Sequence, residues 1–124
     1  MKKIYYYKLI RDRIPEKIRK KGGTSETRVL KAGEFERELL KKVEEEASAL
    51  PRVRSRTALI SELADVIDVL YEIKKVKKIS DKEIAAAQRE NFKRKGGFRK
   101  RLYLVWASDT GYRTNERRYE RTSA

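Results

Sequence analysis

The sequence contains neither cysteine nor histidine. These absences exclude disulfides, Cys/His zinc sites, Ser-His-Asp triads and Cys-His dyads formed within the chain. No apolar run approaches the ~18 residues of a membrane span, and the N-terminus MKKIYYYKLIRDR lacks the apolar core of a signal peptide. We therefore expect a cytoplasmic protein with no membrane association, whose chemistry uses carboxylates, lysines, arginines, hydroxyls or a hard metal ion.

Charge is what the sequence has in abundance. Charged residues make up 42% of the 124 residues, and the formal net charge is +14. The net charge is +8 over residues 1–31, −1 over residues 32–92 and +7 over residues 93–124. A nearly neutral centre rich in carboxylates thus lies between two basic ends. Basic ends suit either nucleic acid or the phosphates of a small molecule.

Helical signals dominate the pattern along the chain. Pro15 suits the first turn of a short helix in PEKIRKK, which a pair of glycines would end. SDKE has the spacing of a capping box and predicts a helix that begins at Ser80 and ends near a second glycine pair. Two longer helices are predicted between them, at about 33–50 and 56–75.

These elements predict an all-α fold, with a helical hairpin or bundle as its core, a third C-terminal helix and short flanking extended segments. TRVL (27–30) is expected to be extended, and the weak alternation in RLYLV (101–105) is compatible with a strand. We expect one domain at 1–106 and a basic, flexible tail at 107–124.

The first long helix places one glutamate among apolar residues. At about 100° per residue, Glu46 falls between Phe35 and Leu39 on the apolar arc of this helix. Glu44 points away from the arc, and Glu45 lies at its far flank. The three consecutive glutamates therefore have different expected environments, and Glu46 is the one that points inward.

The second long helix repeats this feature. Its apolar stripe is predicted to consist of Leu59, Leu63, Val66, Leu70 and Ile73. Glu62 lies within this stripe and Asp65 at its edge, whereas Asp68 and Glu72 lie further out, on a solvated face. Two helices thus each direct a carboxylate, Glu46 and Glu62, toward a shared interior.

Two inward carboxylates need a compensating charge, because an unpaired buried carboxylate costs several kcal/mol or is forced to protonate. Mg²⁺ or Mn²⁺ is one candidate, since hard cations prefer oxygen ligands. A lysine or arginine is the other, and the chain has 33 of them. The residues alone leave both alternatives open.

Three stretches carry a family pattern. They are YKLIRDRIPEKIRKKGG (7–23), the acidic pair EE (45–46) with ELAD (62–65), and RKGGFRKRLYL (94–104). In this order they resemble the MazG-like all-α nucleotide pyrophosphohydrolases, in particular the branch labelled phosphoribosyl-ATP pyrophosphohydrolase-like. The likeness covers the chain from about residue 6 to 105.

The resemblance implies bundled helical hairpins in a homo-oligomer, most simply a homodimer. It also implies an Mg²⁺-dependent enzyme, with Mn²⁺ as a substitute, that cleaves a nucleoside triphosphate between its α- and β-phosphates. The products are a monophosphate and pyrophosphate, and a house-cleaning role on noncanonical nucleotides is favoured over a step of histidine biosynthesis. Carried over to this chain, Glu46, Glu62 and Asp65 would hold the metal, and Glu45 and Glu46 would be catalytic.

One position departs from the family pattern. The superfamily has EExxE followed by ExxD, and the last glutamate of the first motif falls at Ala49 here. A ligand is therefore missing, which implies weaker metal binding, a substitute such as Asp68 or Glu45, or loss of catalysis. Projection places Ala49 next to Glu45, so Glu45 is the nearest candidate to cover the gap and to orient or deprotonate the attacking water.

Basic side chains are expected to hold the phosphates of the substrate. Lys8 and Arg11 in the N-terminal stretch are the first candidates, and Arg94 and Arg101 in the C-terminal stretch come next. The alternative for each of the four is an ordinary surface cation, and this alternative is favoured for Arg94 and Arg101.

Two other functions remain open at this point. The basic ends, including the tail RTNERRYERTSA, suit a relative with weak or no catalysis that binds nucleic acid, although no nucleic-acid-binding motif is present. A purely structural or regulatory oligomer is the second alternative. Binding that falls steeply with salt, without hydrolysis, would mark the first, and indifference to Mg²⁺ and nucleotide would mark the second.

Overall fold

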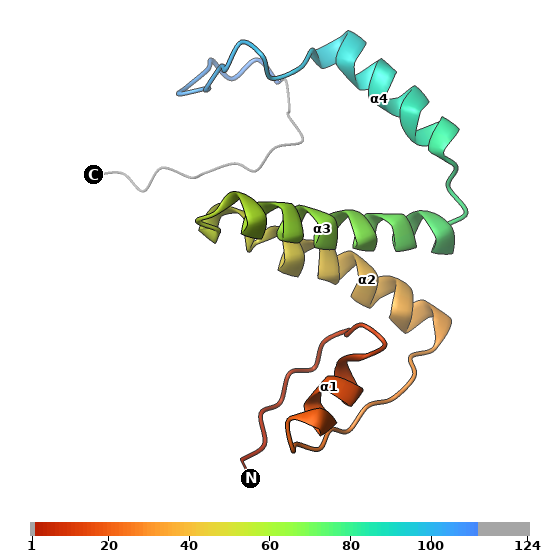
Figure 1. Ribbon diagram of the computed structural model, residues 1–124. Coiled ribbons are helices and arrows are strands. Elements are labelled where there is room, and N and C mark those ends of the chain that lie inside the picture. Colours follow the sequence, from red (N-terminus) through yellow and green to blue (C-terminus); the bar gives the residue numbers. More distant parts are fainter. Residues whose placement is uncertain (1, 112–124) are drawn as a thin grey trace. The chain divides into compact units, whose positions relative to one another are not determined.

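The computed structural model describes residues 2–111. In this part of the chain the elements follow the order α1 (Ile14–Lys20), α2 (Ala32–Ala47), the 3-10 turn η1 (Leu50–Arg52), α3 (Arg56–Val76) and α4 (Asp81–Lys95) (Figure 1). None of the described residues belongs to a β-strand, so the predicted all-α class is confirmed. The strand considered at 101–105 is wrong, because no second strand exists among residues 2–111 to pair with it.

The chain divides into two compact units between Ala87 and Gln88, within α4. The first unit holds α1, α2, η1 and α3, and the second holds the end of α4 and the segment that follows it. Most of the tail predicted at 107–124 lies outside the described residues. None of the helices described has the length and apolar character needed to cross a membrane.

Helix α1 begins and ends within one residue of its predicted bounds. Pro15 occupies its first turn, where a missing N–H costs nothing. Gly22 follows the helix at a φ of +85°, a left-handed conformation that glycine adopts without strain, and its N–H donates to the carbonyl of Arg19 at 2.9 Å. The stretch before α1, residues 2–13, has almost no regular structure.

Helices α2 and α3 form the predicted hairpin and pack against each other in antiparallel directions (Figure 1). Leu39 of α2 is 4% exposed and is the one buried residue among residues 2–111. Lys77, just after α3, forms an ion pair with Glu36 near the start of α2. The hairpin is therefore a thin, two-helix layer with little core of its own.

Helix α2 ends three residues before its predicted end. Its last residue is Ala47, and the Oγ of Ser48 donates to the carbonyl of Glu45 at 2.7 Å. The N–H of Ala49 then bonds to Glu46 in the tighter three-residue spacing. Serine competes locally for backbone partners, and the residue before Pro51 disfavours helical geometry, so the chain turns early into η1.

Helix α3 is rotated relative to the prediction. The side chains turned most inward include Ala58, Glu62, Val66, Val69 and Ile73. Of the predicted apolar stripe, Val66 and Ile73 therefore turn inward, whereas Leu59, Leu63 and Leu70 are exposed. The outer face of α3 is also apolar and is formed by Leu59, Ile60, Leu63, Ile67, Leu70 and Tyr71. These six residues are between 39% and 61% exposed. The helix is thus apolar over about two-thirds of its circumference, more than one neighbouring helix can cover.

Two serines fix the starts of the long C-terminal helices. The Oγ of Ser55 accepts from the N–H of Ala58 at 3.1 Å and caps α3. At α4 the predicted capping box is confirmed: the N–H of Glu83 donates to Ser80 Oγ at 3.1 Å, and the N–H of Ser80 donates to Glu83 Oε2 at 2.8 Å. The bond from the Ser80 N–H, with a further one from the Ser80 hydroxyl, holds the pKa of the Glu83 carboxyl below its ordinary value.

Candidate metal centre

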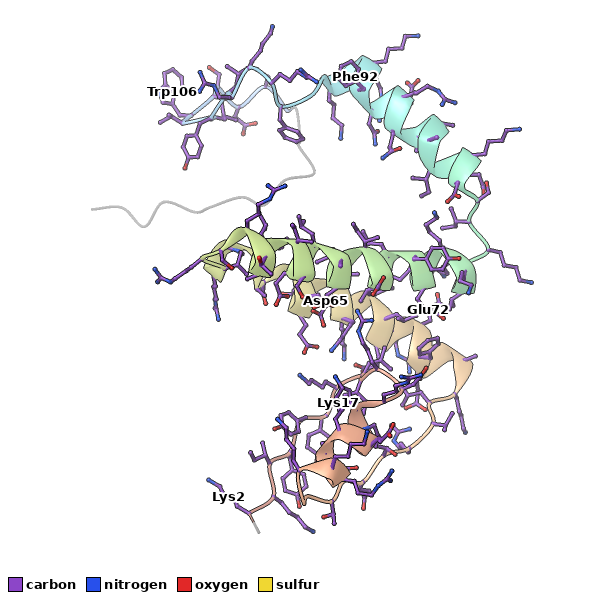
Figure 2. The ribbon with its side chains drawn as sticks, in the orientation of Figure 1. Lys2, Lys17, Asp65, Glu72, Phe92 and Trp106 are labelled. Atoms are coloured by element: carbon purple, nitrogen blue, oxygen red, sulfur yellow. The ribbon has the colours of Figure 1, made fainter. Side chains whose placement is uncertain are left out.

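Three carboxylates from the two hairpin helices converge at one place. Glu46 comes from α2, and Glu62 and Asp65 come from successive turns of α3. One oxygen of each lies within 4.8 Å of the others, and all three residues are half-buried. Figure 2 labels Asp65 on the side of α3 along which α2 runs. We call these residues the three-carboxylate cluster.

The cluster follows from the register of the two helices. Glu62 and Asp65 are three residues apart, so they share one side of α3. Glu46 lies one residue before the end of α2, and the short connection through η1 returns the chain so that α3 passes beside it. Glu44 and Glu45, the other two members of the glutamate run, are exposed, as the projection predicts for Glu44.

The cluster fits a single hard cation. Oxygens that bind the same Mg²⁺ at about 2.1 Å are at most about 4.2 Å apart, so a spread within 4.8 Å requires only small side-chain adjustments. Three carboxylates provide half of the octahedral shell of Mg²⁺ and leave positions for water or phosphate oxygens. The residues therefore have the chemistry to hold a divalent metal ion.

Lys42 is the residue that the sequence analysis missed. Its Nζ lies 3.0 Å from Glu45 Oε2 and 3.5 Å from Glu46 Oε1, and its side chain is only 13% exposed. It therefore supplies one positive charge at the edge of the cluster. The signal was present in the sequence, because lysine lies three and four residues before these glutamates on the same helix.

Arg11 brings a second positive charge from the N-terminal segment. Its Nη2 lies 3.0 Å from Asp65 Oδ1 and 2.8 Å from Asp68 Oδ2. The hydrogen bond to Asp68 raises the pKa of Arg11 above its ordinary value, and the charges of Asp68, Asp65 and Glu46 reinforce this despite partial desolvation. Arg11 thus bridges a member of the three-carboxylate cluster and the exposed Asp68 one turn further along α3.

Lys8 supplies the third positive charge and contacts Glu45. Its Nζ lies 3.0 Å from Glu45 Oε1, while Lys42 holds the other oxygen of the same carboxylate. Partial burial raises the pKa of Glu45, but the hydrogen bonds from Lys8 and Lys42 together lower it more, so the carboxyl titrates below its ordinary value. Glu45 is therefore held by two lysines rather than grouped with the three-carboxylate cluster. Its predicted compensation for Ala49 stays a prediction.

The local charges do not cancel. Glu45, Glu46, Glu62, Asp65 and Asp68 face Lys8, Arg11 and Lys42, so five carboxylates against three cations leave a formal charge of −2. Within residues 2–111, Glu62 has no ion-pair partner. Lysine and arginine side chains thus compensate the carboxylates at the edges of the cluster. Among residues 2–111 the half-buried Glu62 has no such partner, so a metal ion stays open as its compensating charge.

The remaining predicted phosphate-binding residues belong to the second unit. Arg94 donates from Nη2 to Asn91 Oδ1 at 3.0 Å and forms an ion pair with Glu90, both in α4. Arg101 lies after α4 at a φ of +57°, a left-handed conformation that is uncommon for a side chain with a Cβ. Their predicted role in phosphate binding stays a prediction.

The fold and the cluster together define an all-α protein with a carboxylate site that could hold a metal ion. Comparisons of the chain with protein families, with curated proteins and with solved structures find no match.

Proposed function

We propose that the protein is an Mg²⁺-dependent nucleotide pyrophosphohydrolase. The observation that carries this proposal is the three-carboxylate cluster, in which Glu62 has no ion-pair partner among residues 2–111. The residual charge of −2 matches one divalent cation. The order of motifs that resembles the MazG-like enzymes supports the same activity, as does the position of Lys8 and Arg11 beside the cluster.

The reaction is the attack of water on the α-phosphorus of a nucleoside triphosphate. A new P–O bond forms, the bond between the α-phosphorus and the bridging oxygen breaks, and the products are a monophosphate and pyrophosphate. A divalent ion held by Glu46, Glu62 and Asp65 would neutralise phosphate charge and acidify the water. Glu45, the neighbour of Glu46 in the sequence, would take the proton from that water.

Lys8 and Arg11 would bind the phosphates that leave. Both side chains already lie at the rim of the cluster. The side chain of Lys8 is 42% exposed and that of Arg11 is 59% exposed. Arginine presents a planar fork of donors that matches phosphate oxygens, and lysine adds a mobile point charge. Charge that develops on the leaving pyrophosphate is therefore met by cations that need to move only a short distance.

A panel of canonical and noncanonical nucleotides with Mg²⁺ or Mn²⁺, scored for released pyrophosphate, tests the proposal. We expect turnover on at least one nucleotide and none in the presence of a chelator. Glu62→Gln should abolish turnover while the helix content measured by circular dichroism stays unchanged. Glu44→Gln, a matched change on the exposed side of α2, should retain it. Normal turnover by Glu62→Gln would overturn the assignment.

Nucleic-acid binding is the alternative outcome of the same test. It predicts affinity for DNA or RNA that falls steeply with salt, and no pyrophosphate release. The basic C-terminal end, residues 93–124 with a net charge of +7, is the part of the chain that this alternative would use.

The outer face of α3 supports self-association as a homodimer. Ile60, Leu63, Ile67 and Leu70 repeat at the alternating spacing of three and four residues that places a second helix along the first. The six residues of this face expose on the order of 500 Å² of surface, a large patch for a monomer and most of the about 800 Å² that one partner contributes to a standard interface. A second copy brings an identical helix with the same seam, as a twofold interface requires.

Sedimentation equilibrium of the full chain tests the dimer. Ile67→Lys, at the centre of the outer face, should convert a dimer into a monomer, because it places two ammonium groups in an apolar seam. Ser61→Lys adds the same charge to an exposed position of α3 outside that face and should leave the dimer intact. A wild-type chain that stays monomeric at tens of micromolar would contradict self-association.

A further inference from the structure

Arg11 contacts the three-carboxylate cluster in a way that opposes a metal ion. Its guanidinium lies 3.0 Å from the oxygen of Asp65 and 2.8 Å from that of Asp68. A divalent cation bound to Asp65 would be only a few ångströms from this positive charge. The two cations would therefore compete for the same carboxylate.

The guanidinium has no route to relieve that competition by losing its proton. Arginine stays protonated under all ordinary conditions. Relief must come from movement of the side chain toward another anion. The side chain is 59% exposed, so packing does not lock it against Asp65 and Asp68.

A phosphate group is the anion that would draw Arg11 away. Its tetrahedral oxygens accept the guanidinium fork in the same bidentate manner as two carboxylates, and a phosphate oxygen can at the same time enter the coordination shell of the metal. Lys8, three residues earlier, holds the segment against Glu45 at 3.0 Å, which keeps Arg11 near the cluster while it moves.

We propose that Arg11 couples metal binding to phosphate binding at this site. In the free protein it lowers the affinity of the cluster for a divalent cation, and a phosphate ligand restores that affinity by taking Arg11 from Asp65. This inference rests on the proposed function, because it assumes that the cluster binds a metal ion. Coupling of this kind is reciprocal, so a bound cation also raises the affinity of Arg11 for phosphate.

Mn²⁺ titrations followed by electron paramagnetic resonance test the coupling in the full chain. Without phosphate, Arg11→Gln should bind Mn²⁺ about tenfold more tightly than the wild type, the effect of removing one charge a few ångströms from a divalent ion in a largely hydrated setting. Arg13→Gln removes the same charge from the same exposed stretch and should change the affinity less than about twofold.

Inorganic phosphate completes the cycle. At a fixed millimolar concentration, corrected for its own Mn²⁺ complex, phosphate should tighten Mn²⁺ binding to the wild type and have little effect on Arg11→Gln. If Arg11→Gln does not fold, Arg11→Lys keeps the charge, loses the fork and should show a smaller gain in affinity.

The outcomes separate the two proposals. Equal Mn²⁺ affinity of the wild type and Arg11→Gln, with and without phosphate, would overturn the coupling and leave the metal site in place. Absence of Mn²⁺ binding in every variant, with phosphate present, would overturn the proposed function and the coupling with it.

Discussion

The two basic ends of the chain carry nearly equal charge but make different contacts. Residues 1–31 have a net charge of +8, and Lys8 and Arg11 among them reach carboxylates 37 to 57 residues away on α2 and α3. Residues 93–124 have a net charge of +7, yet Arg94 contacts only Glu90 and Asn91 of its own helix among the described residues.

The comparison shows that what a cationic side chain contributes depends on which carboxylate the fold places beside it. An exposed pair four residues apart on a helix, such as Arg94 with Glu90, contributes about 0.3–0.5 kcal/mol and reports only on that helix. Arg11 joins two carboxylates of a distant helix, so it links the N-terminal segment to the three-carboxylate cluster. The predictions below test whether this difference in contacts becomes a difference in function.

The largest effect is expected when the shared carboxylate is removed. Asp65→Asn deletes a metal ligand and the partner of Arg11 together. We expect Mn²⁺ affinity to fall on the order of a hundredfold, measured by titration, and pyrophosphate release to fall at least as far. Glu72→Gln, which also lies on α3 (Figure 2), is the control and should stay within about threefold. If Asp65→Asn bound Mn²⁺ as tightly as the wild type, Asp65 would not be a metal ligand, and Arg11 would not contact the metal site through it.

The N-terminal cations come next. Arg11→Gln and Lys8→Gln should each lower kcat/KM for a nucleotide about tenfold, because each deletes a charge-assisted contact with phosphate worth about 1–2 kcal/mol. Steady-state kinetics with saturating Mg²⁺ measures this effect separately from the metal affinity. If the variants differ from the wild type only in their affinity for Mg²⁺, and kcat/KM at saturating Mg²⁺ is unchanged, neither residue contacts the substrate.

A pH experiment tests the docking of Lys8. The pKa of Glu45 is lowered from its ordinary value of 4.5, so its contact with Lys8 stabilises the fold above that pH and is lost as the pH falls through the lowered pKa. Thermal unfolding of the wild type and Glu45→Gln should differ at pH 7 by less than about 1 kcal/mol, since the pair is partly exposed, and should converge as the pH falls through the lowered pKa of Glu45. A difference that stays constant as the pH is lowered until the carboxyl is protonated would assign the stabilisation to packing instead.

The smallest effect is expected at the C-terminal end. Arg94→Gln should change kcat/KM less than about twofold, because its described contacts are confined to α4. A tenfold loss of kcat/KM would place Arg94 among the phosphate-binding residues. Both basic ends would then contribute to phosphate binding.

Residue spacing within one element predicted much of this structure. The capping box at Ser80, the inward direction of Glu46 and the start of α3 depend on neighbours a few residues away, and all three are found in the structure. The proximity of Glu62 and Asp65 follows from the same rule.

Contacts between elements could not be predicted in this way. Periodicity shows that α3 is apolar over a wide arc, but only its packing against α2 selects which part of the arc turns inward, and that choice exposed Leu63 and Leu70. The pairing of Arg11 with Asp65 joins residues 54 apart, and no spacing rule reaches across an irregular segment. The contact of Lys42 with Glu46 could have been predicted, because the two residues are four apart on the same helix.

The serine cap of α3 determines which insertions and deletions the site can tolerate. Ser55 fixes the first turn of the helix, and Glu62 follows seven residues later, close to two full turns. A residue inserted before Ser55 lengthens a loop and leaves the helix register unchanged. A residue inserted between Ser55 and Glu62 turns both α3 carboxylates by about 100° away from Glu46. Length variation among natural relatives of this chain should therefore concentrate in residues 48–54 and avoid 56–65.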